Sequence, residues 1–334
     1  MRIKIMLFVL FIYATHFLHA QSLEILTSGK NISFRGLSVV NEQVLWASGT
    51  NGTVVRSIDG GKTFEWLTVK GFEQSDFRDI EALDENVAYI MAVDSPGLIL
   101  KTTDAGNSWT KVYVDTMKGV FLDAMAFNQK GDAIVVGDPL ADLKTYMVYK
   151  NEHQSDFKKL KTNQSLLKGE AFFAASGTNI QFIPGTDEFV SVTGGMASRF
   201  HHHDVSLSLP LMQGTESSGA NSIAIWDNKN MYVVGGDFSN DTISTGNACF
   251  TKDGGLTWQR PNQNPHGYRS CVIYLTANKL LACGTSGVDI STDGGLTWES
   301  ISTLSYHVCQ ISKSGKAVFL AGTKGRITKL IFWE

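Results

Sequence analysis

Short apolar runs separated by polar turns repeat along almost the whole chain. In the first repeat, apolar and β-branched residues occupy most of positions 37–40, 44–47, 54–56 and 64–69. Glycine, asparagine and aspartate are concentrated between these runs, and this alternation is typical of β-hairpins. Each repeat is therefore predicted to contain four short antiparallel strands.

One turn phrase sets the period of the repeat. Segments 57–64, 102–109, 251–258 and 291–298 all read Ser/Thr-x-Asp-x-Gly-x-Ser/Thr-aromatic. Two degenerate copies, with Glu152 and Asp204 in the aspartate position, fill the gap in the middle of the chain. Four strands in a period of about 40 to 50 residues are typical of propeller blades.

The turn phrase has a structural role. Its aspartate, between the third and fourth strands, is expected to accept backbone N–H groups, and the glycine after it supplies a positive φ. The aromatic residue is expected to pack between blades. The predicted structural residues are Asp59, Asp104, Asp253, Asp293, Trp109, Trp258 and Trp298.

The strand count predicts how the ring closes. Seven first strands are recognisable, but the last repeat ends after its third strand. Residues 23–27 form a spare strand that can pair with the last repeat and remove its exposed edge. The predicted fold is an all-β, seven-bladed β-propeller of four-stranded antiparallel blades, formed by residues 21–334 as one domain and closed by the N-terminal strand.

The first twenty residues have the pattern of a secretory signal peptide. Arg2 and Lys4 precede an apolar stretch at 6–13, and Ala20 marks the expected cleavage site. The chain is therefore predicted to be secreted or periplasmic, without a membrane span. Its formal net charge of −3 gives no support to nucleic-acid binding. A monomer is expected.

Cysteine and histidine give little support to a metal or cofactor site. None of the four cysteines forms a C-x-x-C pair, and a disulfide between Cys271 and Cys283 on neighbouring strands is left open. Residues 201–204, His-His-His-Asp, coincide with a degenerate turn phrase. Adjacent strand residues point to opposite sides, so these side chains are interpreted as a solvated turn. No metal and no cofactor are predicted.

Candidate binding residues lie where each first strand begins, at the mouth of the central channel. Aligning these starts gives Arg35, Arg78, Leu122, Glu170 or Ala171, Asn221, Arg269 and His307, with Asp79, Asp123 and Tyr268 beside them. Arg35, Arg78 and Arg269 are predicted to form an anion clamp, because guanidinium groups bind carboxylate or phosphate in a bidentate manner. Asp138 and Asp237 follow second strands and are expected on the same face. In the alternative reading, each arginine pairs with a carboxylate of its own blade.

The chain resembles a known family in several of these segments. The residues that carry the resemblance are 34–39, 76–82, 123–127, 137–139, 169–178, 234–237 and 267–270. They resemble bacterial propellers related to the photosystem II stability/assembly factor, in particular a secreted subgroup often labelled oxidoreductase or glycosyl-hydrolase-like. The resemblance implies a seven-bladed ring and, by analogy with the assembly factor, chaperone-like binding of a polypeptide. The oxidoreductase label lacks support, because no G-x-G-x-x-G segment or haem motif is found.

Two functions follow from these residues. The favoured one is non-enzymatic binding of an acidic peptide or acidic glycan at the arginine-lined mouth. The alternative is a glycan-active enzyme, because sialidases combine three arginines with a tyrosine–glutamate pair and an aspartate that acts as the acid/base catalyst. Tyr268, Glu170 and either Asp79 or Asp123 are the candidates for a hydrolase, and His307 or Tyr268 is the candidate base of a lyase.

Overall fold

Each repeat folds into an antiparallel sheet whose strands follow one another in chain order. The computed structural model describes residues 21–93 and 95–332. The first three sheets have four strands each. They are formed by β2 (Phe34–Val39), β3 (Leu45–Gly49), β4 (Thr53–Ser57) and β5 (Glu65–Thr68); by β6 (Phe77–Ala82), β7 (Ala88–Ala92), β8 (Gly97–Thr102) and β9 (Thr110–Asp115); and by β10 (Leu122–Phe127), β11 (Ala133–Gly137), β12 (Tyr146–Lys150) and β13 (Lys158–Leu160).

The middle of the chain forms one larger sheet of eight strands. Its members are β14 (Glu170–Ala171), β15 (Ile180–Phe182), β16 (Phe189–Gly195), β17 (Arg199–His202), β18 (Val205–Ser208), β19 (Ser218–Ile225), β20 (Met231–Asp237) and β21 (Ala248–Thr251). Strands β16 and β19 join through a single residue pair, Gly194 with Gly219. The sheet therefore consists of two strand groups with a narrow connection.

The last two sheets again have four strands. One contains β22 (Cys271–Thr276), β23 (Lys279–Gly284), β24 (Gly287–Ser291) and β25 (Glu299–Ser302). The other contains β26 (Val308–Ile311), β27 (Val318–Gly322), β28 (Arg326–Phe332) and β1 (Gln21–Thr27), and the short 3-10 helix η1 (Thr323–Gly325) connects β27 to β28.

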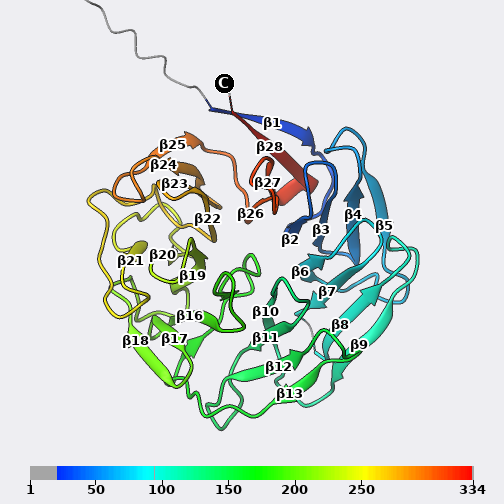
Figure 1. Cartoon of the computed structure of the whole chain (residues 1–334), viewed down its shortest axis with the longest axis horizontal. Helices are drawn as coiled ribbons and strands as arrows, with labels where there is room; N and C mark the ends of the chain where they lie inside the picture. Colours follow the sequence, from blue (N-terminus) through cyan, green and yellow to red (C-terminus); the bar gives the residue numbers. More distant parts are fainter. Residues whose placement is uncertain (1–20, 94, 333–334) are drawn as a thin grey trace, which may run out of the picture.

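The sheets stand around a common centre (Figure 1). Strands β2, β6, β10, β22 and β26 lie on the inner side, whereas β5, β9, β13 and β25 lie on the periphery. Strand β1 pairs with β28 from Gln21–Phe332 to Thr27–Ile327, so the N-terminal strand completes the last sheet as predicted. The all-β architecture of four-stranded antiparallel sheets is confirmed. The predicted leader at 1–20 lies outside the described residues, and none of the helices within them is long and apolar enough to cross a membrane.

Apolar side chains fill the space between neighbouring sheets. Trp46 of β3, for example, is fully buried in one cluster with Ile80 and Ile90 of the next sheet. The aromatic residues of the turn phrase extend these clusters. The ring of Trp258 lies 5.2 Å from that of Phe200, which belongs to the preceding strand group. These contacts bury apolar side chains between one sheet and the next.

The turn-phrase aspartates cap their own turns. Asp293 accepts the N–H of Thr297 at 2.9 Å and its hydroxyl at 2.6 Å, while Ser291 donates from the other side. Asp59, Asp104 and Asp253 have the same contacts. The Thr257 hydroxyl is the main reason why the pKa of Asp253 falls to about 2. The predicted N–H-accepting role of these aspartates is therefore seen in the structure.

A glycine of the same phrase permits the contact between two sheets. Gly295 has φ +87°, and a Cβ added to it would lie 2.1 Å from the ring of Tyr232. That ring is buried, and its hydroxyl donates to the Gly295 carbonyl at 2.9 Å and accepts from Trp298 at 2.9 Å. Tyr232 consequently has little freedom to move away.

We expect Gly295→Ala to destabilise the fold more than a matched glycine change does. Gly315→Ala is the control, because Gly315 has φ +74° but no atom within 4 Å of an added Cβ. The positive φ alone costs about 1 kcal/mol, and the clash at Gly295 adds about 2 kcal/mol. Urea unfolding of both variants measures the difference. Equal losses would contradict the proposed clash.

The four cysteines are buried and free. Cys271 lies opposite Cys283 in the register of β22 and β23, but the two do not form a disulfide. The possibility left open by the sequence is therefore not realised in this structure.

Candidate functional site

The inner strands share one irregularity. In four of the sheets an extra residue interrupts the pairing of the inner strand with its neighbour. These residues are Arg35, Arg78, Asp123 and Asn221. A β-bulge leaves its extra residue outside the ladder and can redirect the side chain. All four residues line a single cavity.

The cavity has a volume of about 350 Å³ and two kinds of wall. Its polar and charged residues are Arg35, Arg78, Asp123, Asn221, Tyr268, Thr285 and His307. Its apolar residues are Phe121, Phe172, Phe173, Ala174, Ala175 and Phe238. The structure thus brings together six of the residues predicted from the sequence, and it adds an aromatic wall that the sequence analysis missed.

The two arginines are unequally neutralised. The Nε of Arg78 lies 2.7 Å from a carboxylate oxygen of Asp76. Arg35 makes no ion pair within residues 21–93 and 95–332, and its NH1 group reaches the Ala175 carbonyl only at 3.5 Å. Burial, together with the charge of Arg78, lowers the pKa of Arg35. A bound anion would offset both the cost of burying the Arg35 charge and its repulsion by Arg78.

His307 adds a neutral polar group to the same wall. Burial and the charges of Arg35 and Arg78 lower the pKa of His307 to about 3. The imidazole is therefore uncharged at neutral pH. Its Nε2 atom is buried without a hydrogen-bond partner in the part of the chain that the structure describes. It can serve as a hydrogen-bonding group toward a ligand.

Asp123 brings a carboxyl group to the cavity, and Asp138 lies close enough to affect its charge. Asp123 is 1% exposed, and neither of its oxygens has a hydrogen-bond partner among the described residues. Burial, and then the charge of Asp138, raise the pKa of Asp123 well above its ordinary value. Burial likewise raises the pKa of Asp138 to about 6, against the opposing hydrogen bond from the Phe172 N–H. Below about pH 6, protonation of Asp138 therefore adds to the positive balance that Arg35 and Arg78 give the cavity.

Tyr268 belongs to the aromatic wall. Its hydroxyl donates to the side-chain oxygen of Asn221 at 2.8 Å, and burial raises its pKa. Phe238 packs edge-on against Tyr268 at 6.2 Å and against Phe173 at 5.6 Å. Phe173, Phe238 and Tyr268 are far apart in sequence, but together they form one aromatic surface.

Arg269 does not line the cavity, and its assignment to the anion clamp is not supported by the geometry. Its side chain is fully buried, with Nε and NH2 lying 2.7 and 2.6 Å from Asp289 of β24. NH1 donates to the Tyr268 carbonyl and to Ser286. The alternative reading, in which an arginine pairs with a carboxylate of its own blade, holds for Arg269 and, through Asp76, for Arg78.

The misassignment is a shift of one residue. A Cβ on Gly49 would meet the Cα of Phe34 at 3.1 Å, and a Cβ on Gly284 would meet the Cα of Arg269 at 2.9 Å. Arg269 therefore occupies the position of Phe34, and Ser270 occupies that of Arg35. One step along a strand turns a side chain to the other face. Gly137 makes the same contact with Leu122, at 3.4 Å, so Asp123 rather than Leu122 corresponds to Arg35.

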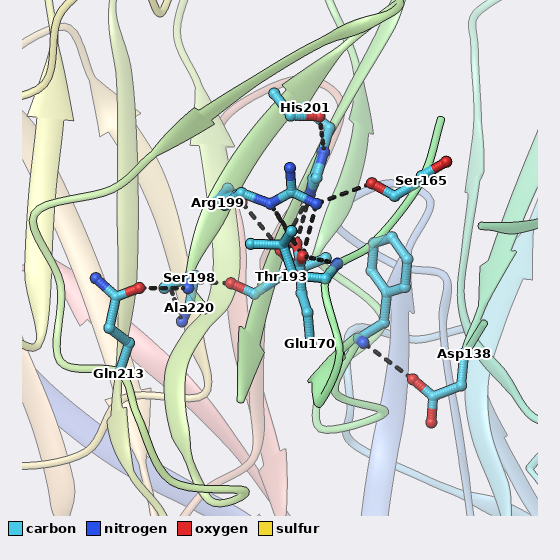
Figure 2. A network of polar contacts seen from close by, with 12 residues as sticks. Asp138, Ser165, Glu170, Thr193, Ser198, Arg199, His201, Gln213 and Ala220 are labelled. Atoms are coloured by element: carbon cyan, nitrogen blue, oxygen red, sulfur yellow. Dashed lines mark hydrogen bonds and ion pairs between the residues drawn. The ribbon is translucent and has the colours of Figure 1, made fainter. Parts of the chain in front are cut away.

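Glu170 lies in a separate network (Figure 2). Its carboxylate lies 2.6 Å from Arg199 NH2 and 3.1 Å from His201 Nε2, and it also accepts from Thr193. Burial alone would raise the pKa of Glu170, but the bonds from His201 and Arg199 outweigh it and lower the pKa to about 2. Because Tyr268 donates to Asn221 instead, the tyrosine–glutamate pair expected for a sialidase-like enzyme is not formed.

The other predicted carboxylates have local roles. Asp79 is buried and accepts the N–H groups of Ile80 and Met125, while burial raises its pKa. Asp237 accepts from Ser239 and Asn240 in the turn after β20. Neither is among the residues that line the cavity. Phe238 lines the cavity but was not predicted. Its position could have indicated this role, because it directly follows Asp237 at the end of a second strand that was expected to rise on this face.

Comparisons with known proteins agree with this architecture. Residues 16–119 match the family model of the photosynthesis system II assembly factor YCF48. A solved structure described as YCF48 bound to D1 peptide is 16% identical, with 94% of this chain and 97% of that chain covered and a TM-score of 0.65. YCF48 from Cyanidioschyzon merolae is 14% identical over 92% and 98% of the two chains, with a TM-score of 0.67.

A protein with another name shares the fold to a similar degree. The WD40 repeats of RRP9 are 14% identical over 93% of this chain and 97% of that chain, with a TM-score of 0.64. A search of curated proteins finds no match. At these identities the solved structures establish the fold alone. The resemblance inferred from the sequence is confirmed for part of the chain: residues 16–119 match the YCF48 family model, and the solved YCF48 structures share the fold over almost the whole chain.

Proposed function

We propose that this propeller binds an acidic polypeptide segment in the cavity between Arg35 and Arg78. The observation that carries the proposal is the pair of cavity-lining guanidinium groups, of which only Arg78 has an ion pair in the described parts of the chain. A carboxylate of the ligand would supply the missing charge. Arginine suits this role because its planar group binds carboxylates through two parallel hydrogen bonds.

The aromatic wall favours a peptide over a sugar acid. Phe121, Phe172, Phe173 and Phe238 offer apolar surface without hydrogen-bonding groups. A polypeptide combines carboxylates with apolar side chains. The side chains of Asn221 and Thr285 can form hydrogen bonds with its main chain. The similar propeller YCF48 has been solved with a bound D1 peptide, which supports a peptide as the ligand class. A hydrolase that uses Tyr268 and Glu170 is disfavoured, because these side chains belong to separate networks.

The proposal includes the architecture and the location of the protein. Counting the two strand groups of the largest sheet separately gives seven blades. The charged and apolar pattern of residues 1–20 supports export to the periplasm or the medium. An exported propeller with an anion-binding cavity is suited to hold exposed acidic segments of other exported chains.

The test is peptide binding as a function of pH. The probe is a fluorescent decapeptide that contains glutamate and phenylalanine, and its control has glutamine in place of glutamate. We expect the acidic peptide to bind at least about tenfold more tightly than the control. Its affinity is expected to fall by roughly three- to tenfold from pH 5 to pH 7.5, because ionisation of Asp138, whose pKa is about 6, adds negative charge beside the bound anion.

The source of the pH dependence can be isolated. His307, with a pKa of about 3, stays neutral throughout this range, and the glutamates of the peptide stay ionised. Asp138→Asn is therefore expected to weaken the dependence of the affinity on pH. Equal affinity for the acidic and amide peptides, measured by fluorescence anisotropy, would refute the proposed ligand class.

A further inference from the structure

A second cluster of chemically active side chains lies at the tip of the β17–β18 hairpin. It consists of Glu188, His202 and His203, whose possible ligand atoms all lie within 4.8 Å of one another. We propose that these three residues form a binding site for one divalent transition-metal ion, with Zn²⁺ as the best match. The site shares no residue with the arginine cavity, and it was not expected from the sequence.

The strand register places two of the ligands on one face. His202 lies opposite Val190 in the pairing of β17 with β16. Glu188 precedes Val190 by two residues, and side chains two apart on an extended chain point the same way. The carboxylate and the imidazole therefore meet, with His202 Nε2 lying 3.2 Å from Glu188 Oε2.

The third ligand, His203, lies beyond the strand, so its side chain does not follow the alternation between the two faces. His203 has φ +51° and comes directly after the end of β17. Its ring instead stacks on that of His202, with 4.3 Å between centroids. The expectation that neighbouring histidines point apart holds for His201, which is buried and bonded to Glu170 and Ser206. It does not hold for His203.

The cluster rests on an ordered turn. The main-chain N–H of Glu188 donates to the hydroxyl of Thr186 at 3.1 Å, and that hydroxyl donates to the Ile183 carbonyl at 2.9 Å. The N–H of Ile183 returns a bond to the Glu188 carbonyl at 2.8 Å. His202 is only 27% exposed. The backbone of the carboxylate ligand and one imidazole are thus held in place before any ion arrives.

The distances suit a tetrahedral ion. Zn²⁺ binds imidazole nitrogen and carboxylate oxygen at about 2.0–2.2 Å, which places neighbouring ligand atoms about 3.3 Å apart. His202 Nε2 lies 3.2 Å from Glu188 Oε2, and His203 Nε2 lies 3.6 Å from the other carboxylate oxygen, Oε1. Two nitrogens and a carboxylate favour Zn²⁺, Cu²⁺ or Ni²⁺ over Mg²⁺ or Ca²⁺. Three protein ligands leave a fourth position for water or another ligand.

The test is titration of the chain, purified without a polyhistidine tag, with ZnCl₂ by isothermal calorimetry. We expect one ion per chain, and we expect His203→Ala and Glu188→Gln each to weaken binding at least about tenfold. Co²⁺ is expected to give the visible absorption bands of a tetrahedral site.

His153→Ala is the matched control. His153 is 86% exposed and lies 3.4 Å from Glu152, so it offers a histidine–carboxylate pair without a third ligand. Its replacement is expected to leave Zn²⁺ binding unchanged, and circular dichroism checks that every variant is folded. The proposal is overturned if the unmodified chain binds well below one ion. It is also overturned if the double variant Glu188→Gln/His203→Ala retains the affinity of the unmodified chain.

Discussion

Replacing Arg35 and Arg78 together by glutamine is expected to weaken acidic-peptide binding by at least about 100-fold. Both side chains line the cavity, and Arg35 makes no ion pair within the described residues. Losing one partner of a partly buried charge pair costs about 2 kcal/mol or more, and two such losses multiply in affinity. Glutamine keeps polarity and much of the side-chain length. Fluorescence anisotropy with the glutamate-containing peptide measures the effect.

Arg260→Gln serves as the control for this pair. Arg260 is exposed, does not line the cavity, and donates to the Pro210 carbonyl. Arg260→Gln removes one positive charge, against two in the double variant, and its affinity should remain within about twofold of the unmodified chain at physiological salt. If the Arg35 and Arg78 double variant binds as well as the Arg260 variant, the acidic segment binds somewhere else on the ring.

Local turn chemistry explains why much of the fold was predictable. The degenerate phrases at Glu152 and Asp204 do lie between β12 and β13 and between β17 and β18. The spacing of the phrases was sufficient to locate these two turns, because a hairpin turn is determined by a few adjacent residues. The closing strand was predictable for a different reason. A repeat with an unpaired edge requires a partner, and residues 23–27 were the only spare strand identified in the sequence analysis.

The site was less predictable, because it depends on register. Tyr268–Arg269 has the same aromatic–arginine pattern as Phe34–Arg35, yet the two pairs differ by one position relative to their neighbouring strands. The difference is seen in which residue contacts the glycine fifteen positions later: it is the aromatic residue Phe34 at Gly49, but the arginine Arg269 at Gly284. The bulges that turn Asp123 and Asn221 into the cavity are likewise not encoded in apolar periodicity. Nor does the periodicity indicate that residues 172–175 enter the cavity wall.

Replacing Arg269 by methionine is expected to destabilise the propeller by about 3–5 kcal/mol. The change leaves the carboxylate of Asp289, which is fully buried, without its guanidinium partner. His266 still donates to Asp289 through its main chain and its ring, both at 2.9 Å, but it does not replace a permanent positive charge. The Tyr268 carbonyl also loses a donor at 2.8 Å. The free energy of unfolding, measured in urea, should show a loss of this size.

A double variant separates the unpaired charge from the lost packing. Asp289→Asn removes the buried charge and keeps an oxygen that can accept from the His266 N–H. Arg269→Met/Asp289→Asn is therefore expected to be more stable than Arg269→Met alone, by about 1 kcal/mol or more. The folded fraction of either variant should still bind the acidic peptide, since Arg269 does not line the cavity. Loss of peptide binding with unchanged stability would instead restore Arg269 to the anion clamp, and it would mean that the register assigned to β22 and β23 is wrong.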